Sequence, residues 1–139
     1  MFEFKDFIDS LEDNLASYDG EHDDFINYCP KLFNLLCNIF SDNDISHEIR
    51  YKMSLAIAYF VVPEDVVPEN VFGPIGYVDD IYMSVLMINE VIGLRGIEFI
   101  KKHWDYYEDI QLVLNECLEQ SEKLLNDEEK KETLKFVGL

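Results

Sequence analysis

The chain has 139 residues, of which 48% are hydrophobic and 14% aromatic, and its 29 acidic and 11 basic side chains give a formal charge of −18. This length suits a single domain spanning 1–139, and the apolar content excludes an intrinsically disordered protein. The negative charge repels nucleic-acid phosphates and anionic membrane faces, so we expect no direct nucleic-acid binding, while basic proteins and cations remain candidate partners.

Apolar residues recur at helical spacing along the chain, and no stretch shows the alternation of a β-strand. We therefore predict an all-α fold, a single-domain helical bundle of about six helices. The turns between them are rich in Gly, Asp, Asn and Ser. The predicted helices lie at about 2–17, 22–41, 45–62, 77–92, 96–126 and 128–137.

Turn and proline residues within these patterns predict where the helices begin and break. Pro30 lies inside the second helix and predicts a kink or short break at 28–29. The turn 41–44 offers an N-cap to the third helix. We expect the fifth helix to break near 104–107, and Asn126 to cap the last one.

The helices at 45–62 and 77–92 are the most apolar, and we expect them to form the centre of the bundle. The first of them is apolar on all sides in its second half, which is typical of a helix surrounded by protein. The stretch 59–80 that joins them holds three of the four prolines, two glycines and five acids without a base. We predict a rigid, non-helical connection at one end of the bundle.

Nine residues of this stretch form a spaced motif: Tyr59, Pro63, Asp65, Pro68, Glu69, Gly76, Tyr77, Asp79 and Asp80. The pattern Y-x-x-x-P-x-D-x-x-P, followed by an apolar spacer and G-x-x-D-D, resembles the YkvA-like family of unknown function. The resemblance covers about 45–92. It implies two helices joined by the proline segment and brings no established enzymatic activity. The acidic chain departs from the family, whose members are often basic around the motif.

We favour a structural role for the motif carboxylates. Asp65 can accept hydrogen bonds from the backbone N–H groups that follow it. Asp79 and Asp80 fall in the first turn of the fourth helix, where a carboxylate gains roughly 0.3–1 kcal/mol from the helix dipole. This interpretation uses the motif without a ligand, so we expect no cofactor and no catalytic residue.

A divalent-cation site is the alternative interpretation. Asp65, Glu69 and one of Asp79 or Asp80 would supply the oxygen ligands that Ca²⁺ or Mg²⁺ prefers. Neighbouring helical residues point about 100° apart, so one of the two aspartates would face the connection and the other outward. A third interpretation is a hydrolase that uses clustered carboxylates for acid–base catalysis, although no nucleophile–base pair is recognisable.

The histidines and cysteines predict no metal centre. His22, His47 and His103 are scattered without helical spacing between them, which argues against zinc. The odd set Cys29, Cys37 and Cys117 lies on apolar stripes, so these residues are interpreted as reduced thiols of the core. The aromatic run 103–107 supports two interpretations, an exposed patch for a partner or part of the core, and we favour the core.

The function predicted from these features is that of a non-enzymatic binding or scaffold protein with an acidic surface for a basic protein partner. Residues 1–28 carry nine acids against Lys5, so imitation of DNA phosphates by an inhibitor is an alternative. The N-terminus lacks the features of a secretory signal, and the apolar run 53–62 is about half a bilayer span. We expect a cytoplasmic protein without a membrane span; the sequence leaves its partner and oligomeric state open.

Overall fold

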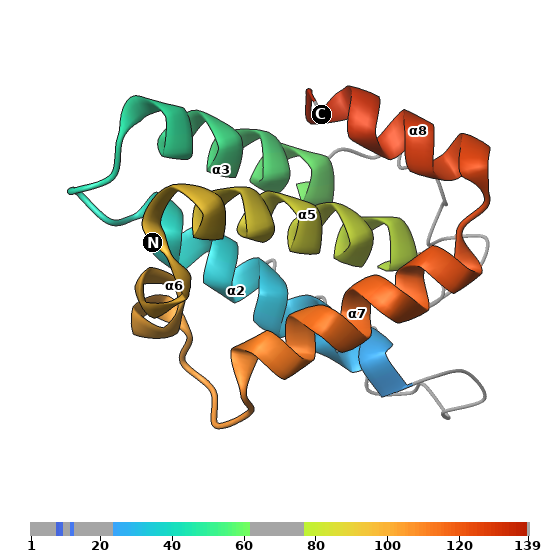
Figure 1. The fold of residues 1–139 in the computed structure, drawn as a ribbon, viewed down its shortest axis with the longest axis horizontal. Coiled ribbons are helices and arrows are strands. Elements are labelled where there is room, and N and C mark those ends of the chain that lie inside the picture. Colours follow the sequence, from blue (N-terminus) through green and yellow to red (C-terminus); the bar gives the residue numbers. More distant parts are fainter. Residues whose placement is uncertain (1–7, 10–11, 13–23, 62–76, 139) are drawn as a thin grey trace.

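The computed structural model describes residues 8–9, 12, 24–61 and 77–138 (Figure 1). This part of the chain is helical and contains no strand, so the prediction of an all-α helical bundle is confirmed. Most of the predicted first helix, 2–17, and most of the connection 59–80 lie outside the described residues. None of the described helices combines the length and the apolarity that a membrane crossing requires.

Six α-helices and one 3₁₀ helix are described. Their bounds are η1 Asp24–Tyr28, α2 Cys29–Phe40, α3 His47–Val61, α5 Val78–Arg95, α6 Ile97–His103, α7 Ile110–Leu124 and α8 Asp127–Phe136.

Local sequence signals explain most of these boundaries. The expected break at 28–29 is confirmed, because η1 gives way there to α2 with Pro30 in its first turn. Gly96 ends α5 in the left-handed region, at φ 88°, a few residues later than predicted. Asn126 caps α8 as predicted, and its backbone N–H donates in return to Glu129, which completes a capping box.

The N-cap of α3 differs from the prediction. Ser46 caps the helix, since its Oγ accepts a hydrogen bond from the N–H of Ile49 at 3.2 Å. The carboxylate of Asp42, in the turn expected to provide the cap, accepts instead from the N–H of Asp44 at 2.8 Å. The turn therefore closes on itself and leaves α3 to begin after it.

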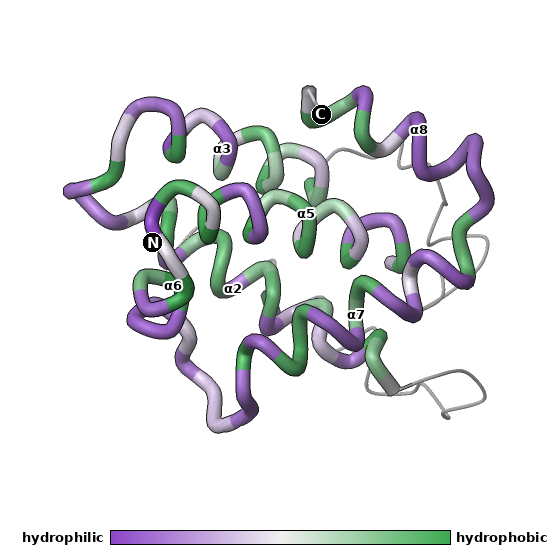
Figure 2. Tube along the Cα trace, in the orientation of Figure 1, coloured by the Kyte–Doolittle hydropathy of each residue, from purple (hydrophilic) through white to green (hydrophobic). Residues whose placement is uncertain are grey.

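The core is centred on α5, which packs against α2, α3, α6, α7 and α8. Figure 2 shows hydrophobic residues concentrated on α2 and α5, whereas α8 is mostly hydrophilic. The second half of α3, which we expected to be surrounded by protein, is buried or half-buried from Leu55 to Phe60, whereas the first half is partly exposed. The expectation is wrong for Val61, at the end of α3, which is 47% exposed; in the first half, Tyr51 is 65% exposed.

The N-cap of α7 by Asp109 can be tested by substitution. The Oδ1 atom of Asp109 accepts from the N–H groups of Gln111 and Leu112, at 2.9 and 3.3 Å. Replacing Asp109 by Ala is expected to lower the free energy of unfolding by about 1 kcal/mol, because both amides lose their acceptor. Urea unfolding measures the change. Glu122→Ala, on the exposed side of the same helix, is the control, and equal losses in the two variants would contradict the assigned cap.

Candidate functional site

The described structure contains four of the nine motif residues, at the two ends of the predicted connection. Tyr59 lies in the last turn of α3, Tyr77 directly precedes α5, and Asp79 and Asp80 lie in the first turn of α5. The other five lie outside the described residues: Pro63, Asp65, Pro68, Glu69 and Gly76.

A buried hydrogen bond joins α3 to α5. The hydroxyl of Tyr59 donates to the Oδ2 atom of Asp79 at 2.6 Å, a length typical of a hydrogen bond to a carboxylate. Burial raises the pKa of Tyr59 far above its usual value, and the negative charge of Asp79 raises it further. Tyr59 therefore remains a proton donor at all physiological pH values.

The same hydroxyl also contacts α8. The oxygen of Tyr59 lies 3.3 Å from the Oγ1 atom of Thr133, and that threonine hydroxyl lies 2.9 Å from the carbonyl oxygen of Glu129. The hydroxyl proton of Tyr59 is donated to the carboxylate of Asp79, so a hydrogen bond between the two hydroxyls needs the proton of Thr133. That proton can also be donated to the carbonyl oxygen of Glu129, which is the nearer acceptor. The contact to α8 is thus the weaker of the two.

Both aspartates of the motif are enclosed by the protein. Asp79 and Asp80 are each 0% exposed, so the expectation that one of them faces outward is wrong. Helical spacing predicts the angle between the two side chains, but α5 is covered from several directions by neighbouring helices. Complete shielding from solvent is unfavourable for a carboxylate that must reach a substrate, and it is compatible with a role in packing.

The candidate metal ligands are only partly described. No three His, Cys, Asp or Glu side chains within the described ranges are grouped so that they could hold a metal ion. The cation site also involves Asp65 and Glu69, so it stays a prediction. The cysteines are all buried, and burial raises the pKa of both Cys37 and Cys117 to about 12. These two thiols are therefore protonated at neutral pH.

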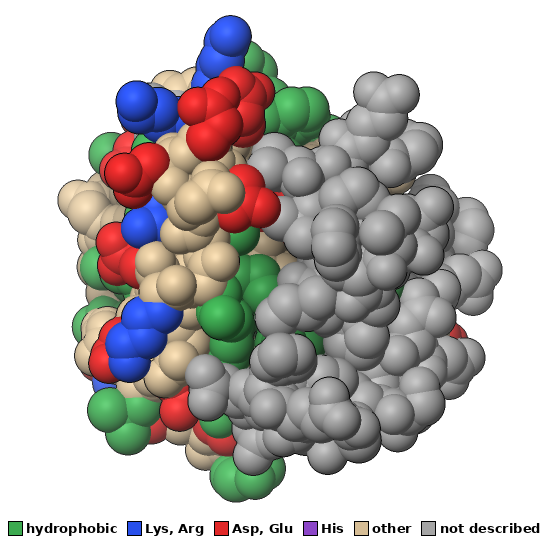
Figure 3. All heavy atoms as spheres, turned by 90° about the vertical axis from the view of Figure 1, so that its right-hand side faces the viewer, with side chains coloured by type: hydrophobic (Ala, Val, Ile, Leu, Met, Phe, Trp, Pro, Cys, Tyr) green, Lys and Arg blue, Asp and Glu red, His purple; other side chains and the backbone are tan. Residues whose placement is uncertain are grey.

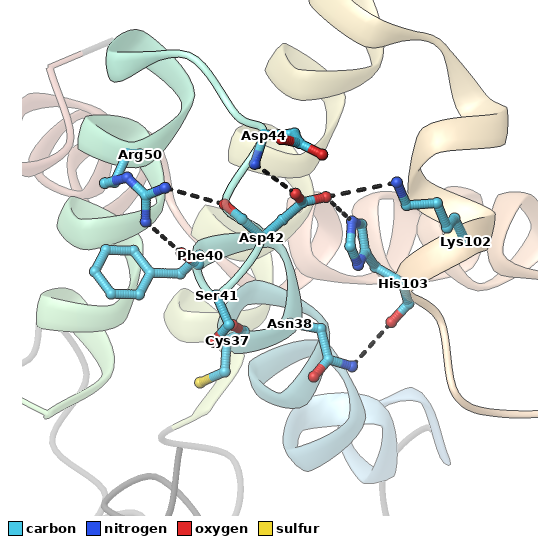
Figure 4. A network of polar contacts seen from close by, with 9 residues as sticks. All are labelled: Cys37, Asn38, Phe40, Ser41, Asp42, Asp44, Arg50, Lys102 and His103. Carbon is cyan, nitrogen blue, oxygen red and sulfur yellow. Dashed lines mark hydrogen bonds and ion pairs between the residues drawn. The ribbon is translucent and has the colours of Figure 1, made fainter.

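A second polar cluster surrounds Asp42 between α2 and α3 (Figure 4). Its Oδ2 atom lies 2.9 Å from Nε2 of His103 and 3.6 Å from Nζ of Lys102, both on α6. On the other side, the guanidinium of Arg50 donates to the carbonyl oxygens of Phe40 and Asp42, at 2.7 and 3.0 Å. The cluster therefore ties the end of α2 to the first turn of α3 and to the end of α6.

A third cluster, at the surface, was missed by the sequence analysis. The ammonium of Lys31 on α2 pairs with Glu108 and lies over three tyrosine rings, at 5.8 Å from Tyr28, 5.1 Å from Tyr106 and 5.8 Å from Tyr107. Such distances allow cation–π attraction. The expectation that the aromatic run 103–107 belongs to the core is wrong for Tyr107, which is 94% exposed.

Carboxylates act electrostatically on two of these tyrosines. After burial, the charges of Glu116 and Glu108 raise the pKa of Tyr28. The pKa of Tyr106 is raised in the same way, by burial and then by Glu12, Asp105 and Glu108. We call this set the tyrosine–carboxylate surface: Tyr28, Tyr106, Tyr107, Glu12, Asp105, Glu108 and Glu116.

Side chains of α2 hold the 104–109 segment in place. The Nδ2 atoms of Asn34 and Asn38 donate to the Oδ2 atom of Asp105, at 3.0 and 2.8 Å. Within the segment, the indole N–H of Trp104 donates to the carbonyl oxygen of Glu108 at 2.8 Å. The two asparagines are one helical turn apart, which is a signal in the sequence, but only the fold reveals their partner.

The buried hydrogen bond leads to a first prediction for this region. Tyr59→Phe removes the donor to Asp79 and is expected to lower the free energy of unfolding by about 1–3 kcal/mol, because a buried carboxylate loses a hydrogen bond. Urea unfolding followed by circular dichroism measures the loss. Thr133→Val removes the 3.3 Å contact and the hydrogen bond to the carbonyl oxygen of Glu129, and it is expected to cost less because no carboxylate loses a donor. The reverse order would contradict the importance given to the bond between Tyr59 and Asp79.

The Asp42 cluster predicts a dependence of stability on pH. The N–H of Asp44, and then His103 and Lys102, lower the pKa of Asp42 below its ordinary value of 3.8. A carboxyl group with a lowered folded pKa stabilises the protein above its unfolded pKa, and this contribution is lost as the pH falls through the folded value. The stability difference between wild type and Asp42→Asn should therefore shrink as the pH falls below about 4.

Urea midpoints measured across this pH range test the prediction. Glu132→Gln, on the exposed side of α8, controls for the loss of one negative charge. A difference between wild type and Asp42→Asn that stays constant down to the most acidic pH would show that the carboxylate gains nothing from its neighbours.

Comparison with known proteins gives similarities without an activity. A family model described as "Protein of unknown function (DUF1232)" matches residues 50–86, which is less than half of the chain and includes Tyr59, Asp79 and Asp80. "Uncharacterized protein ORF9" of Methanothermobacter thermautotrophicus is 29% identical over 129 residues, which cover 93% of this chain and 88% of that protein. No solved structure matches the chain. The chain is thus similar to proteins whose function is unknown.

Proposed function

We propose that this chain is a non-enzymatic binding protein that holds a basic protein partner on the tyrosine–carboxylate surface. The observation that carries the proposal is the position of Lys31, whose ammonium lies over three tyrosine rings and pairs with Glu108. The surface already accommodates one alkylammonium group from its own chain. A lysine or arginine of a partner needs the same combination of ring faces and carboxylates.

Charge favours a cationic partner at this surface. Its four carboxylates are Glu12, Asp105, Glu108 and Glu116, and Lys31 is the cation placed among the tyrosines. Lys31 pairs with Glu108, so the other carboxylates and the exposed ring of Tyr107 can meet a second cation. An exposed aromatic ring beside charged groups is a frequent anchor in protein interfaces.

A fixed backbone further supports the proposal. The hydrogen bonds from Asn34 and Asn38 to Asp105 and the N-cap of α7 restrain both ends of the segment that carries Tyr107. A surface that is ordered before binding loses less conformational entropy when the partner arrives. This is an advantage for a docking site and requires no chemistry from the buried aspartates.

Charges of both signs are mixed on one face of the molecule (Figure 3). Figure 3 shows carboxylates and lysine or arginine side chains interspersed over the described part of one face of the molecule. Net charge alone would not direct a basic partner to one place on such a face. The tyrosines distinguish the proposed surface.

We further propose that the segment 50–86 is YkvA-like, because the motif from Tyr59 to Asp80 falls entirely within it.

Binding of a fluorescein-labelled oligolysine peptide, followed by anisotropy at physiological ionic strength, tests the proposal. Tyr107→Ala leaves the net charge unchanged and is expected to weaken binding about two- to fivefold, the effect of one exposed cation–π contact. Glu116→Gln is expected to weaken binding as well, because it removes a carboxylate from the surface.

Two matched variants and one matched probe complete the design. Tyr51→Ala removes another exposed tyrosine, and Glu48→Gln removes a charge elsewhere on the surface. An oligolysine peptide with acetylated side chains has the same length without the charge. Equal losses at the test and control positions, or equal binding of the acetylated probe, would refute a specific surface.

A further inference from the structure

A groove between α3 and α8 is separate from the tyrosine–carboxylate surface. The groove is open to solvent and has a volume of about 460 Å³, within the range of roughly 300–1,000 Å³ that is typical of sites for small molecules. The residues that characterise its chemistry are Glu48, Tyr51, Lys52, Leu55, Lys135 and Phe136. A groove of this size suits a small ligand better than a helix of a partner protein.

Apolar side chains give the groove a wall for a hydrocarbon or aromatic body. Tyr51 and Leu55 are on α3, and Phe136 is on α8. Tyr51 is 65% exposed, Phe136 is 45% exposed, and Leu55 is half-buried. The ring of Phe136 packs edge-on against the buried ring of Tyr59, with 5.0 Å between the ring centres. Because Tyr59 is itself hydrogen-bonded to Asp79, this side of the groove is formed before a ligand arrives.

The charge of the lining is opposite to that of the protein. Two lysines, Lys52 and Lys135, and one acid, Glu48, line the groove, whereas the chain as a whole carries −18. The ammonium of Lys52 is shared with Glu90 at 3.3 Å, so Lys135 is the more available cation. Lys135 is exposed and lies in the last turn of α8.

We propose that this groove binds a small anionic amphiphile, namely a carboxylate on an apolar body the size of a medium-length acyl chain. The apolar body lies against Tyr51, Leu55 and Phe136, and the carboxylate pairs with Lys135. Glu48 and the strongly negative chain disfavour ligands with several negative charges and the surface of an anionic membrane. The proposal does not depend on the basic partner proposed above.

Decanoate, used below its micelle concentration, is the probe, and amide chemical shifts report where it binds. Saturable shifts are expected at the α3 and α8 residues that line the groove. Decanol, with the same chain and no charge, is expected to bind about tenfold more weakly, and Lys135→Glu is expected to weaken decanoate binding by about the same factor. Lys101→Glu, an equal charge change at an exposed position on α6 outside the groove, should change the affinity less than about twofold.

Three outcomes would overturn the proposal: decanoate shifts confined to other helices, equal affinity for decanol and decanoate, or equal losses in the two lysine variants. A second variant, Tyr51→Asp, places a negative charge in the apolar wall at an exposed position and is expected to abolish decanoate binding. Thermal melts of each variant confirm that the protein is folded, so a loss of binding reports on the groove.

Discussion

The hydrogen bond between Tyr59 and Asp79 is the interaction on which the centre of this fold depends. It joins the last turn of α3 to the first turn of α5, and the contact with Thr133 brings α8 to the same point. A buried carboxylate is costly unless hydrogen bonds replace the water it has lost. The tyrosine hydroxyl supplies one of them. Because this hydrogen bond is directional, it specifies how the three helices are arranged, which apolar packing alone would do less well.

The other end of α3 is held by a different polar cluster. Arg50, in the first turn of α3, donates to the carbonyl oxygens of Phe40 and Asp42 where α2 ends. The side chain of Asp42 in turn contacts His103 at the end of α6. With both ends held in this way, α3 keeps its position although its outer side is not covered by another described helix. That outer side forms one wall of the groove shared with α8. Polar contacts at its two ends thus explain how α3 is held in place while its outer side stays exposed.

Local rules explain which features could be predicted from the sequence. The break before Pro30 and the cap at Asn126 depend on residues close together in the chain, and both were predicted. The tyrosine–carboxylate surface depends on Lys31 and Glu108, which are 77 residues apart, so no local pattern indicates it. The periodicity of α5 gave the angle between Asp79 and Asp80, but their complete burial depends on helices distant in sequence. The roles of Asp65 and Glu69 stay predictions.

A double-mutant cycle between Tyr59→Phe and Asp79→Asn tests the central claim most directly. The free energies of unfolding of wild type, both single variants and the double variant give the coupling between the two side chains. If their hydrogen bond organises the centre of the fold, the double variant should lose less stability than the sum of the single losses, by about 1 kcal/mol or more. Single losses that add to within about 0.3–0.5 kcal/mol would contradict this account.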